Sequence, residues 1–249
     1  MTWAQLLAAS DDSLAGLHAI RVSQVLARTL GARHSVMTVL SSPDRQVPEA
    51  LIPYRPRVAV GHPGIEIVRA AEQIGADLIV IGRSVRASHG CPRLGTTADS
   101  VVRRSNRPCL MIPLGQDRLD HAVVALDGSE RGLMVLGCAQ EFIRARGGDL
   151  EAIHVEPLVR RGNGESASQK SLRILDALGE GRGGNGRAWP LRVLHGDPAE
   201  CLCGELQGAE RDLLVVGARR GGPGGIPEST GVGRTLLYTA PCAVLTVPL

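Results

Sequence analysis

Aromatic residues and lysines are scarce in this chain. Only 2% of its 249 residues are Phe, Trp or Tyr, so a core must be built from Val, Leu, Ile and Ala. Side chains of this kind suit the buried strands of a parallel sheet. Lys170 is the only lysine, and its surroundings exclude the phosphate loop G-x-x-x-x-G-K-[ST]. The formal net charge of +3 is too small to indicate a nucleic-acid-binding protein by itself.

Long apolar runs and paired cysteine motifs are also missing. No run reaches the roughly 18 apolar residues of a membrane-spanning helix, and no basic, apolar leader opens the sequence. We therefore expect a cytoplasmic protein without a membrane partner. The six cysteines form no C-x-x-C motif, so we interpret them as small hydrophobic residues in a reducing compartment. No metal site is expected.

A long internal repeat organises the chain. The segment from Asp77 to Leu114 returns from Asp212 to Leu249 without a gap, an offset of 212 − 77 = 135 positions. The start of the chain repeats as well, because A-S-D-D-S before the first helix corresponds to A-L-D-G-S later. A repeat of this length indicates two copies of one domain. We predict the first domain at residues 1–114 and the second at residues 121–249.

Each copy alternates apolar strands with helices. This order predicts an α/β fold of two tandem, open, doubly wound (Rossmann-like) sheets, each with five parallel strands. The second copy is longer between its second and third strands, where an amphipathic helix is expected from about Ser166. The first copy has a proline-rich loop there, residues 42–56. Its first helix should bury Leu14, Leu17, Ile20, Val22, Val25 and Leu26.

Candidate ligand-binding residues follow from the topology. In open α/β sheets, ligands bind beyond the carboxyl ends of the strands. A glycine- and arginine-rich loop follows one such strand end at Gly82 and leads to Gly95-Thr96 at a helix start, which suits an anion. The simpler alternative is that these glycines only turn the chain. The residues at predicted strand ends are Asp11, Gly82, Asp127 and Gly217.

Several motifs together resemble the universal stress protein family. They are A-D-L-I-V-I-G at residues 76–82, G-T-T-A-D-S-V-V-R-R-S at 95–105, V-A-L-D-G-S at 124–129, I-H-V at 153–155 and H-G-D-P at 195–198. The resemblance covers nearly the whole chain in two tandem copies. It implies that the domains pair through their last strands about a pseudo-twofold axis, Cys109 to Pro113 meeting Ala243 to Pro248. Dimerisation of the whole chain is compatible with the sequence, which does not set it.

The resemblance also implies a ligand, ATP with Mg²⁺. Nucleotide-binding members carry G-2x-G-9x-G-[ST], and in both copies the middle glycine is replaced, by Val85 and by Arg220. In the first copy, Gly82, Gly95 and Thr96 occupy the other positions of the motif. In the second copy, Gly221 and Gly231 keep the nine-residue spacing if the motif is shifted by one residue. The implied positions are Asp11 or Asp127 at the ribose, Val39 or Val155 near adenine, and Gly82, Gly95, Thr96, Gly217, Gly221 and Gly231 at the phosphates.

Two functions therefore stay open at this point. The first is a stress-response protein that binds or senses an adenine nucleotide. The second is a protein-interaction module that has kept the fold and lost the ligand. The sequence lacks G-x-S-x-G, H-x-G-H and S-G-G-x-D-S motifs, and its histidines are scattered. We expect no catalytic residues and no enzyme.

Overall fold

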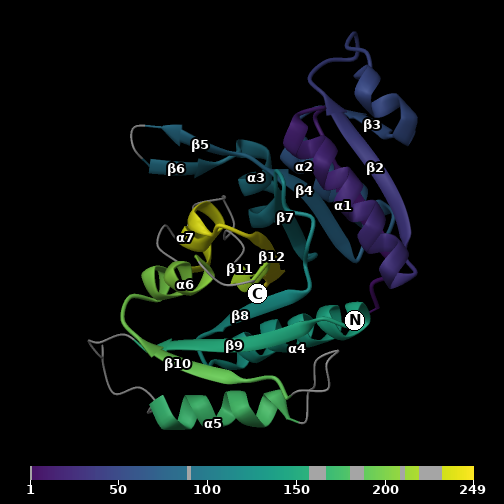
Figure 1. Cartoon of the computed structure of the whole chain (residues 1–249). Coiled ribbons are helices and arrows are strands. Elements are labelled where there is room, and N and C mark those ends of the chain that lie inside the picture. Colours follow the sequence, from purple (N-terminus) through teal and green to yellow (C-terminus); the bar gives the residue numbers. More distant parts are fainter. Residues whose placement is uncertain (1, 89–90, 157–166, 180–187, 208–210, 219–231) are drawn as a thin grey trace. The chain divides into compact units, whose positions relative to one another are not determined.

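The computed structural model describes residues 2–88, 91–156, 167–179, 188–207, 211–218 and 232–249 (Figure 1). They form two compact units, unit 1 mainly from residues 1–117 and unit 2 mainly from residues 118–217 with the C-terminal segment. Each unit is an α/β domain with an open sheet, as predicted. No helix in these ranges is long and apolar enough to cross a membrane. The pairing of the units through their last strands stays a prediction.

Unit 1 contains the five predicted strands in the order β7-β4-β1-β2-β3. Neighbouring strands are parallel, and the register of the central strand places Leu6 beside Leu78 on one side and beside His34 on the other. β1 is buried along its whole length, as its apolar sequence requires. The bounds are β1 Gln5–Ala9, β2 Arg33–Leu40, β3 Arg57–Val60, β4 Leu78–Arg83 and β7 Cys109–Pro113.

The first helix, α1 (Leu14–Leu30), begins and ends as its sequence indicates. The Ser13 hydroxyl accepts the Gly16 N–H, and Gly31 ends the helix with φ 64°. The predicted buried face is partly wrong, because Leu14 and Val25 are 70% and 60% exposed. Periodicity placed them on the edge of the apolar stripe, where no described element covers them. The other helices of unit 1 are α2 (Pro63–Gln73) and α3 (Thr96–Arg104), which pack together.

Two connections of unit 1 differ from the expected loops. The proline-rich stretch contains a short 3₁₀ helix, η1 (Glu49–Tyr54), which buries Leu51 completely. The glycine- and arginine-rich stretch is an antiparallel hairpin of β5 (Val85–Ser88) and β6 (Cys91–Leu94). Pairing of the two short strands gives hydrogen-bond partners to backbone N–H and C=O groups that an irregular loop would leave to solvent. This gain does not depend on the side chains. Composition alone gave no sign of this hairpin.

Unit 2 repeats the arrangement in the order β10-β9-β8-β11-β12. The extra helix expected from about Ser166 is present as α5, between β9 and β10. The N-cap of α4 is again a serine, Ser129, and Gly147 again ends the helix with φ 75°. The bounds are β8 His121–Leu126, α4 Glu130–Arg146, β9 Asp149–Glu156, α5 Ala167–Leu178, β10 Leu191–His195, α6 Pro198–Leu206, β11 Leu213–Ala218, α7 Val232–Thr239 and β12 Ala243–Pro248.

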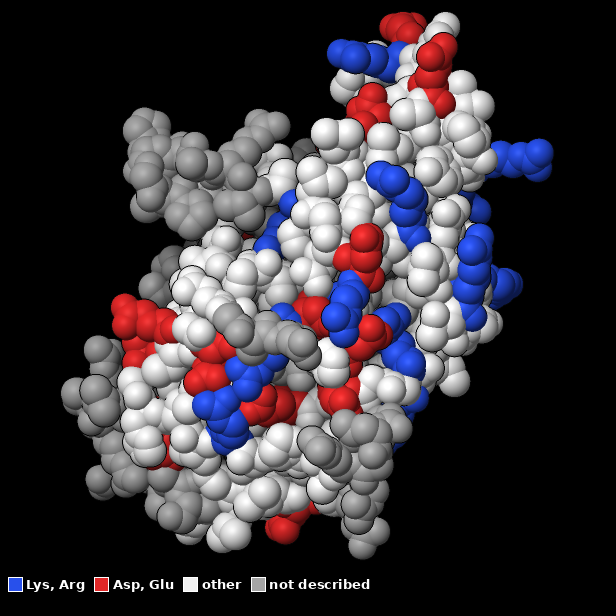
Figure 2. Space-filling view, viewed as in Figure 1, with Lys and Arg blue, Asp and Glu red and all other residues white. Residues whose placement is uncertain are grey.

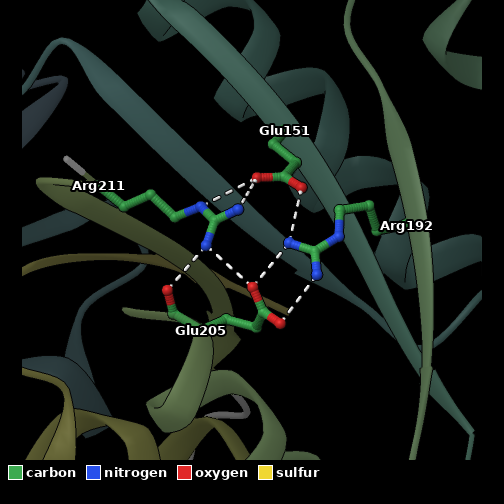
Figure 3. A network of polar contacts seen from close by, with 4 residues as sticks. All are labelled: Glu151, Arg192, Glu205 and Arg211. Atoms are coloured by element: carbon green, nitrogen blue, oxygen red, sulfur yellow. Dashed lines mark hydrogen bonds and ion pairs between the residues drawn. The ribbon is translucent and has the colours of Figure 1, made fainter. Parts of the chain in front are cut away.

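A network of two arginines and two glutamates joins four segments of unit 2 (Figure 3). Arg192 of β10 binds both oxygens of Glu205 of α6, at 2.6 and 2.8 Å. Arg211 donates to Glu151 of β9 at 2.6 Å and to Glu205 at 2.9 Å. Hydrogen bonds from Arg192 are the main cause that lowers the pKa of Glu205. The network lies at the amino ends of the strands, away from the candidate ligand site.

Candidate nucleotide site

The carboxyl end of β8 carries an aspartate turn that is tied to the start of α4. Asp127 is exposed, and its Oδ1 accepts the Ser129 N–H at 2.9 Å and the Ser129 hydroxyl at 2.6 Å. The same hydroxyl oxygen accepts the Gly132 N–H at 3.1 Å. One serine therefore holds both the carboxylate and the first turn of the helix, which fixes the carboxylate without burying it.

Unit 1 builds the same turn with one costly difference. Asp11 Oδ1 accepts the Ser13 hydroxyl at 2.6 Å and the Ser13 N–H at 3.3 Å. The middle residue is left-handed in both units, with φ 73° at Gly128 and φ 66° at Asp12. Glycine takes this conformation without strain, whereas an aspartate is only tolerated there. The turn of unit 1 is therefore the less stable copy of the same structure.

Gly16 and Gly132 make room for these carboxylates, a role that the sequence analysis missed. A Cβ on Gly132 would lie 2.6 Å from Asp127 Oδ1. A Cβ on Gly16 would lie 3.2 Å from Asp11 Oδ1 and 2.5 Å from Ser10 Oγ. The available signal was that both copies keep a glycine five residues after the aspartate.

Gly82 and Gly217 stand where other parts of the chain approach closely. A Cβ on Gly82 would collide with the carbonyl group of Ala15 and lie 2.6 Å from the Gly16 nitrogen. The absence of a side chain at Gly82 therefore lets the start of α1 pack directly against β4. A Cβ on Gly217 would lie 2.6 Å from Leu249 Cδ1. Gly82 thus brings the end of β4 beside the Asp11 turn, as the topology predicts. This close packing requires a glycine at position 82 whether or not a ligand binds.

The start of α3 is the candidate phosphate-binding end of unit 1. Gly95 is its N-cap without a side-chain cap, and its N–H donates to the Ser84 carbonyl at 3.2 Å. Thr96, the first residue of the helix, is exposed. Backbone N–H groups at a helix start favour an anion. Arg83, the last residue of β4, is only 6% exposed and therefore lies within the domain and not in solvent.

The predicted adenine-side residues lie on the strands next to the aspartate turns. Val39 is half-buried on β2, and Val155 is 8% exposed on β9, one position beyond the pair of Leu126 with His154. Val155 is therefore level with Asp127. His154 is 3% exposed and its Nδ1 is 2.8 Å from the Leu126 carbonyl oxygen, which makes it a core histidine.

Two predicted glycines and the question of a metal site remain. Gly221 and Gly231 lie outside the described residues, so the glycine loop of unit 2 stays a prediction. Within the described ranges, no three His, Cys, Asp or Glu side chains are grouped to hold a metal ion.

Two solved structures that match nearly the whole chain support the fold and the duplication. The crystal structure of a universal stress protein from Archaeoglobus fulgidus DSM 4304 is 16% identical with a TM-score of 0.72, over 100% of this chain and 99% of that one. A putative universal stress protein from Pseudomonas aeruginosa UCBPP-PA14 is 16% identical with a TM-score of 0.70, over 98% and 92%. A universal stress protein in complex with cAMP covers 46% of this chain and 100% of its own, at 17% identity and a TM-score of 0.38.

The sequence comparison decides the family. No curated protein matches the sequence. The model of the Universal stress protein family matches residues 48–113 and 119–248, which is most of the chain and falls on both copies. The chain belongs to the universal stress protein family.

Proposed function

We propose that this tandem universal stress protein binds an adenine nucleotide, ATP in the first place, and acts in the stress response as a sensor without turnover. The observation that carries the proposal is the exposed carboxylate at the end of the middle strand, Asp11 in unit 1 and Asp127 in unit 2. Each is held at a fixed position by a serine beside a helix start. A fixed, exposed carboxylate suits the paired hydroxyls of a ribose.

The other site residues complete the proposed binding mode. The aspartate accepts hydrogen bonds from the ribose hydroxyls, and the valine on the neighbouring strand, Val39 or Val155, forms an apolar edge for adenine. In unit 1 the phosphates lie against the N–H groups at the start of α3, near Gly95 and Thr96. Mg²⁺ is bound through the phosphates. No group is assigned to acid–base or nucleophilic chemistry, which is why the proposal is binding and not hydrolysis.

A protein-interaction module is the second candidate, and one observation favours it. Gly82 is explained by its contact with the backbone of α1, so its presence requires no ligand. The hairpin that follows begins with Val85 in the place of the middle glycine. Under this alternative the aspartate turns serve only the folding of α1 and α4.

Thermal-shift and calorimetric titrations of the whole chain with ATP–Mg²⁺ separate the two candidates. Saturation at 100 times the dissociation constant adds about 2.7 kcal/mol of stability. Asp11→Asn and Asp127→Asn keep an oxygen for the serine bonds and lose the charge, and whichever change abolishes the shift identifies the binding unit. Asp176→Asn, an exposed change on α5, is the matched control. No shift with millimolar ATP, ADP or AMP would refute nucleotide binding and favour the interaction module.

A further inference from the structure

The helix α5 occurs in unit 2 alone, and its contacts hold it in place. It packs beside α4 and along β10 (Figure 1), where Ile174 and Leu178 are 0% and 3% exposed. Gln140 of α4 donates its side-chain amide to the last carbonyl groups of α5, at 3.2 Å to Ala177 and 3.4 Å to Leu178. A side chain carried by α5 therefore starts from a fixed position.

One side chain of α5 reaches the aspartate turn of unit 2. Arg173 is half-buried, and its Nη1 donates to the Gly128 carbonyl oxygen at 2.9 Å. Gly128 lies between Asp127 and Ser129, so this hydrogen bond falls inside the turn that carries the exposed carboxylate. The helix is thus connected to the residue on which the proposed nucleotide site depends.

The carbonyl that Arg173 binds belongs to the peptide unit that also binds Asp127. A peptide unit is planar and trans, so the Gly128 carbonyl and the Ser129 N–H point in opposite directions from one rigid plane. Arg173 holds the carbonyl end, and the N–H end donates to Asp127 Oδ1 at 2.9 Å. Rotation of the plane would break both hydrogen bonds. Because glycine at 128 leaves such rotation sterically open, the arginine restricts it.

Unit 1 builds the same turn without this arginine. Its connection at residues 41–56 is described throughout and contains the short η1 in place of α5. The Ser13 N–H lies 3.3 Å from Asp11 Oδ1, whereas the equivalent hydrogen bond of unit 2 is 2.9 Å long. A charged donor at the carbonyl end polarises a peptide unit and strengthens the hydrogen bond at its N–H end. The shorter bond in unit 2 is consistent with this effect of Arg173.

The effect of Arg173 is local, because the surrounding surface is not strongly basic. On the face drawn in Figure 2, acidic and basic side chains are intermixed where β9 and β10 lie. The network described above contributes two charges of each sign there, from Glu151, Arg192, Glu205 and Arg211. General attraction of an anion therefore does not distinguish this part of unit 2, and the hydrogen bond to Gly128 does.

We propose that Arg173 is a positioning residue that makes unit 2 selective for nucleotides with ribose hydroxyls. It fixes the Gly128–Ser129 peptide unit, which together with the Ser129 hydroxyl fixes the Asp127 carboxylate. A fixed carboxylate accepts hydrogen bonds from the hydroxyls of a ribonucleotide and finds no such donor on a nucleotide that lacks them. The inference rests on the proposed nucleotide site and adds to it which unit selects the sugar. Arg173 acts through the peptide unit and not by touching the ligand.

Calorimetric titrations of the whole chain with ATP–Mg²⁺ and with 2′,3′-dideoxy-ATP–Mg²⁺ test the proposal. An Asp11→Asn background removes the carboxylate of unit 1, so that a preference for ribose hydroxyls belongs to unit 2. We expect this protein to bind ATP about tenfold more tightly than the dideoxy nucleotide, the effect of hydrogen bonds to a charged acceptor. Arg173→Met keeps the length of the side chain and should reduce the preference to about threefold or less, with dideoxy binding unchanged.

Two further variants in the same background separate positioning from a general effect. Arg173→Lys keeps a charged donor and should restore part of the preference that Arg173→Met loses. Arg69→Met is the matched control, because it removes an exposed guanidinium that pairs with Glu66 one turn away on α2. It should leave the preference unchanged. Unchanged binding of the dideoxy nucleotide shows that the site of the Arg173→Met protein is folded.

Four results would overturn the proposal. A preference that survives Arg173→Met removes the positioning role, and an equal loss of affinity for both nucleotides makes Arg173 a ligand contact or a purely structural residue. Equal affinity of both nucleotides for the Asp11→Asn protein removes the ribose hydroxyls from unit 2 while nucleotide binding stands. If neither nucleotide binds to the unsubstituted chain at millimolar concentration, the proposed function itself fails, and this inference fails with it.

Discussion

Replacing Gly82 by alanine is the sharpest test of how unit 1 is assembled. The added Cβ would lie 2.6 Å from the Gly16 nitrogen and closer still to the Ala15 carbonyl group. Both are backbone atoms of the first turn of α1, so no side-chain rotation relieves the clash. Overpacking of a core costs about 1–3 kcal/mol, and we expect the upper end because α1 must move away from β4. The aspartate turn would move with it.

The assay uses the fact that each unit has its own tryptophan. In a Trp189→Phe background, fluorescence follows Trp3, buried in unit 1 at 5% exposure, during urea unfolding. Gly95→Ala is the comparison without a backbone clash, since its Cβ would lie 3.2 Å from the Ser84 hydroxyl and 3.9 Å from the Ser84 carbonyl oxygen; as a change of an N-cap it should cost no more than about 1 kcal/mol. A Gly82→Ala protein within about 0.5 kcal/mol of the parent, the range of a neutral surface change, would refute the packing role. Lost nucleotide binding at unchanged stability would instead make Gly82 a phosphate contact.

Three further predictions follow from local structure. Asp12→Gly should raise the stability of unit 1 by about 0.5 kcal/mol by relieving a left-handed aspartate, and Gly128→Asp should lower that of unit 2 similarly; equal urea midpoints would contradict both. The pKa of Glu205 is lower in the folded chain than the ordinary value of about 4.3, so the stability that Glu205 contributes is lost as the pH falls from that ordinary value through the lowered pKa. Glu205→Gln should flatten this part of the plot of unfolding free energy against pH. Burial raises the pKa of Cys138 to about 12, so a thiol reagent at mildly alkaline pH should modify the half-buried cysteines of α6 and spare it.

Features with a local physical cause were predictable from the sequence. The strands and helices of both units follow from short apolar periods bounded by serine caps and glycine ends, such as Ser13 with Gly31. The additional helix of unit 2 was predictable because its amphipathic period is contained in one segment, which the structure has at Ala167–Leu178. The end positions of Asp11 and Asp127 followed from the topology.

Features that depend on contacts between distant segments were not predictable. Leu14 and Val25 match a buried helical period, but burial depends on what packs against that edge of α1, which the period does not reveal. The β5–β6 hairpin depends on backbone pairing that glycine and arginine content conceals. The space that Gly132 leaves for Asp127 appears only when the strand end and the helix start are brought together.

The glycines and the aspartates of the motif are therefore unequal as signs of a ligand. Gly82 faces the backbone of Ala15 and Gly16, which requires glycine, whereas Gly217 faces the end of the Leu249 side chain, which can move aside. An asparagine in place of Asp11 or Asp127 would keep the hydrogen bonds to its serine and lose only a favourable interaction with the helix dipole, about 0.3–1 kcal/mol. Packing thus explains Gly82 fully and the two negative charges only in small part. The exposed carboxylates of Asp11 and Asp127 are therefore the part of the motif on which the proposed nucleotide site rests.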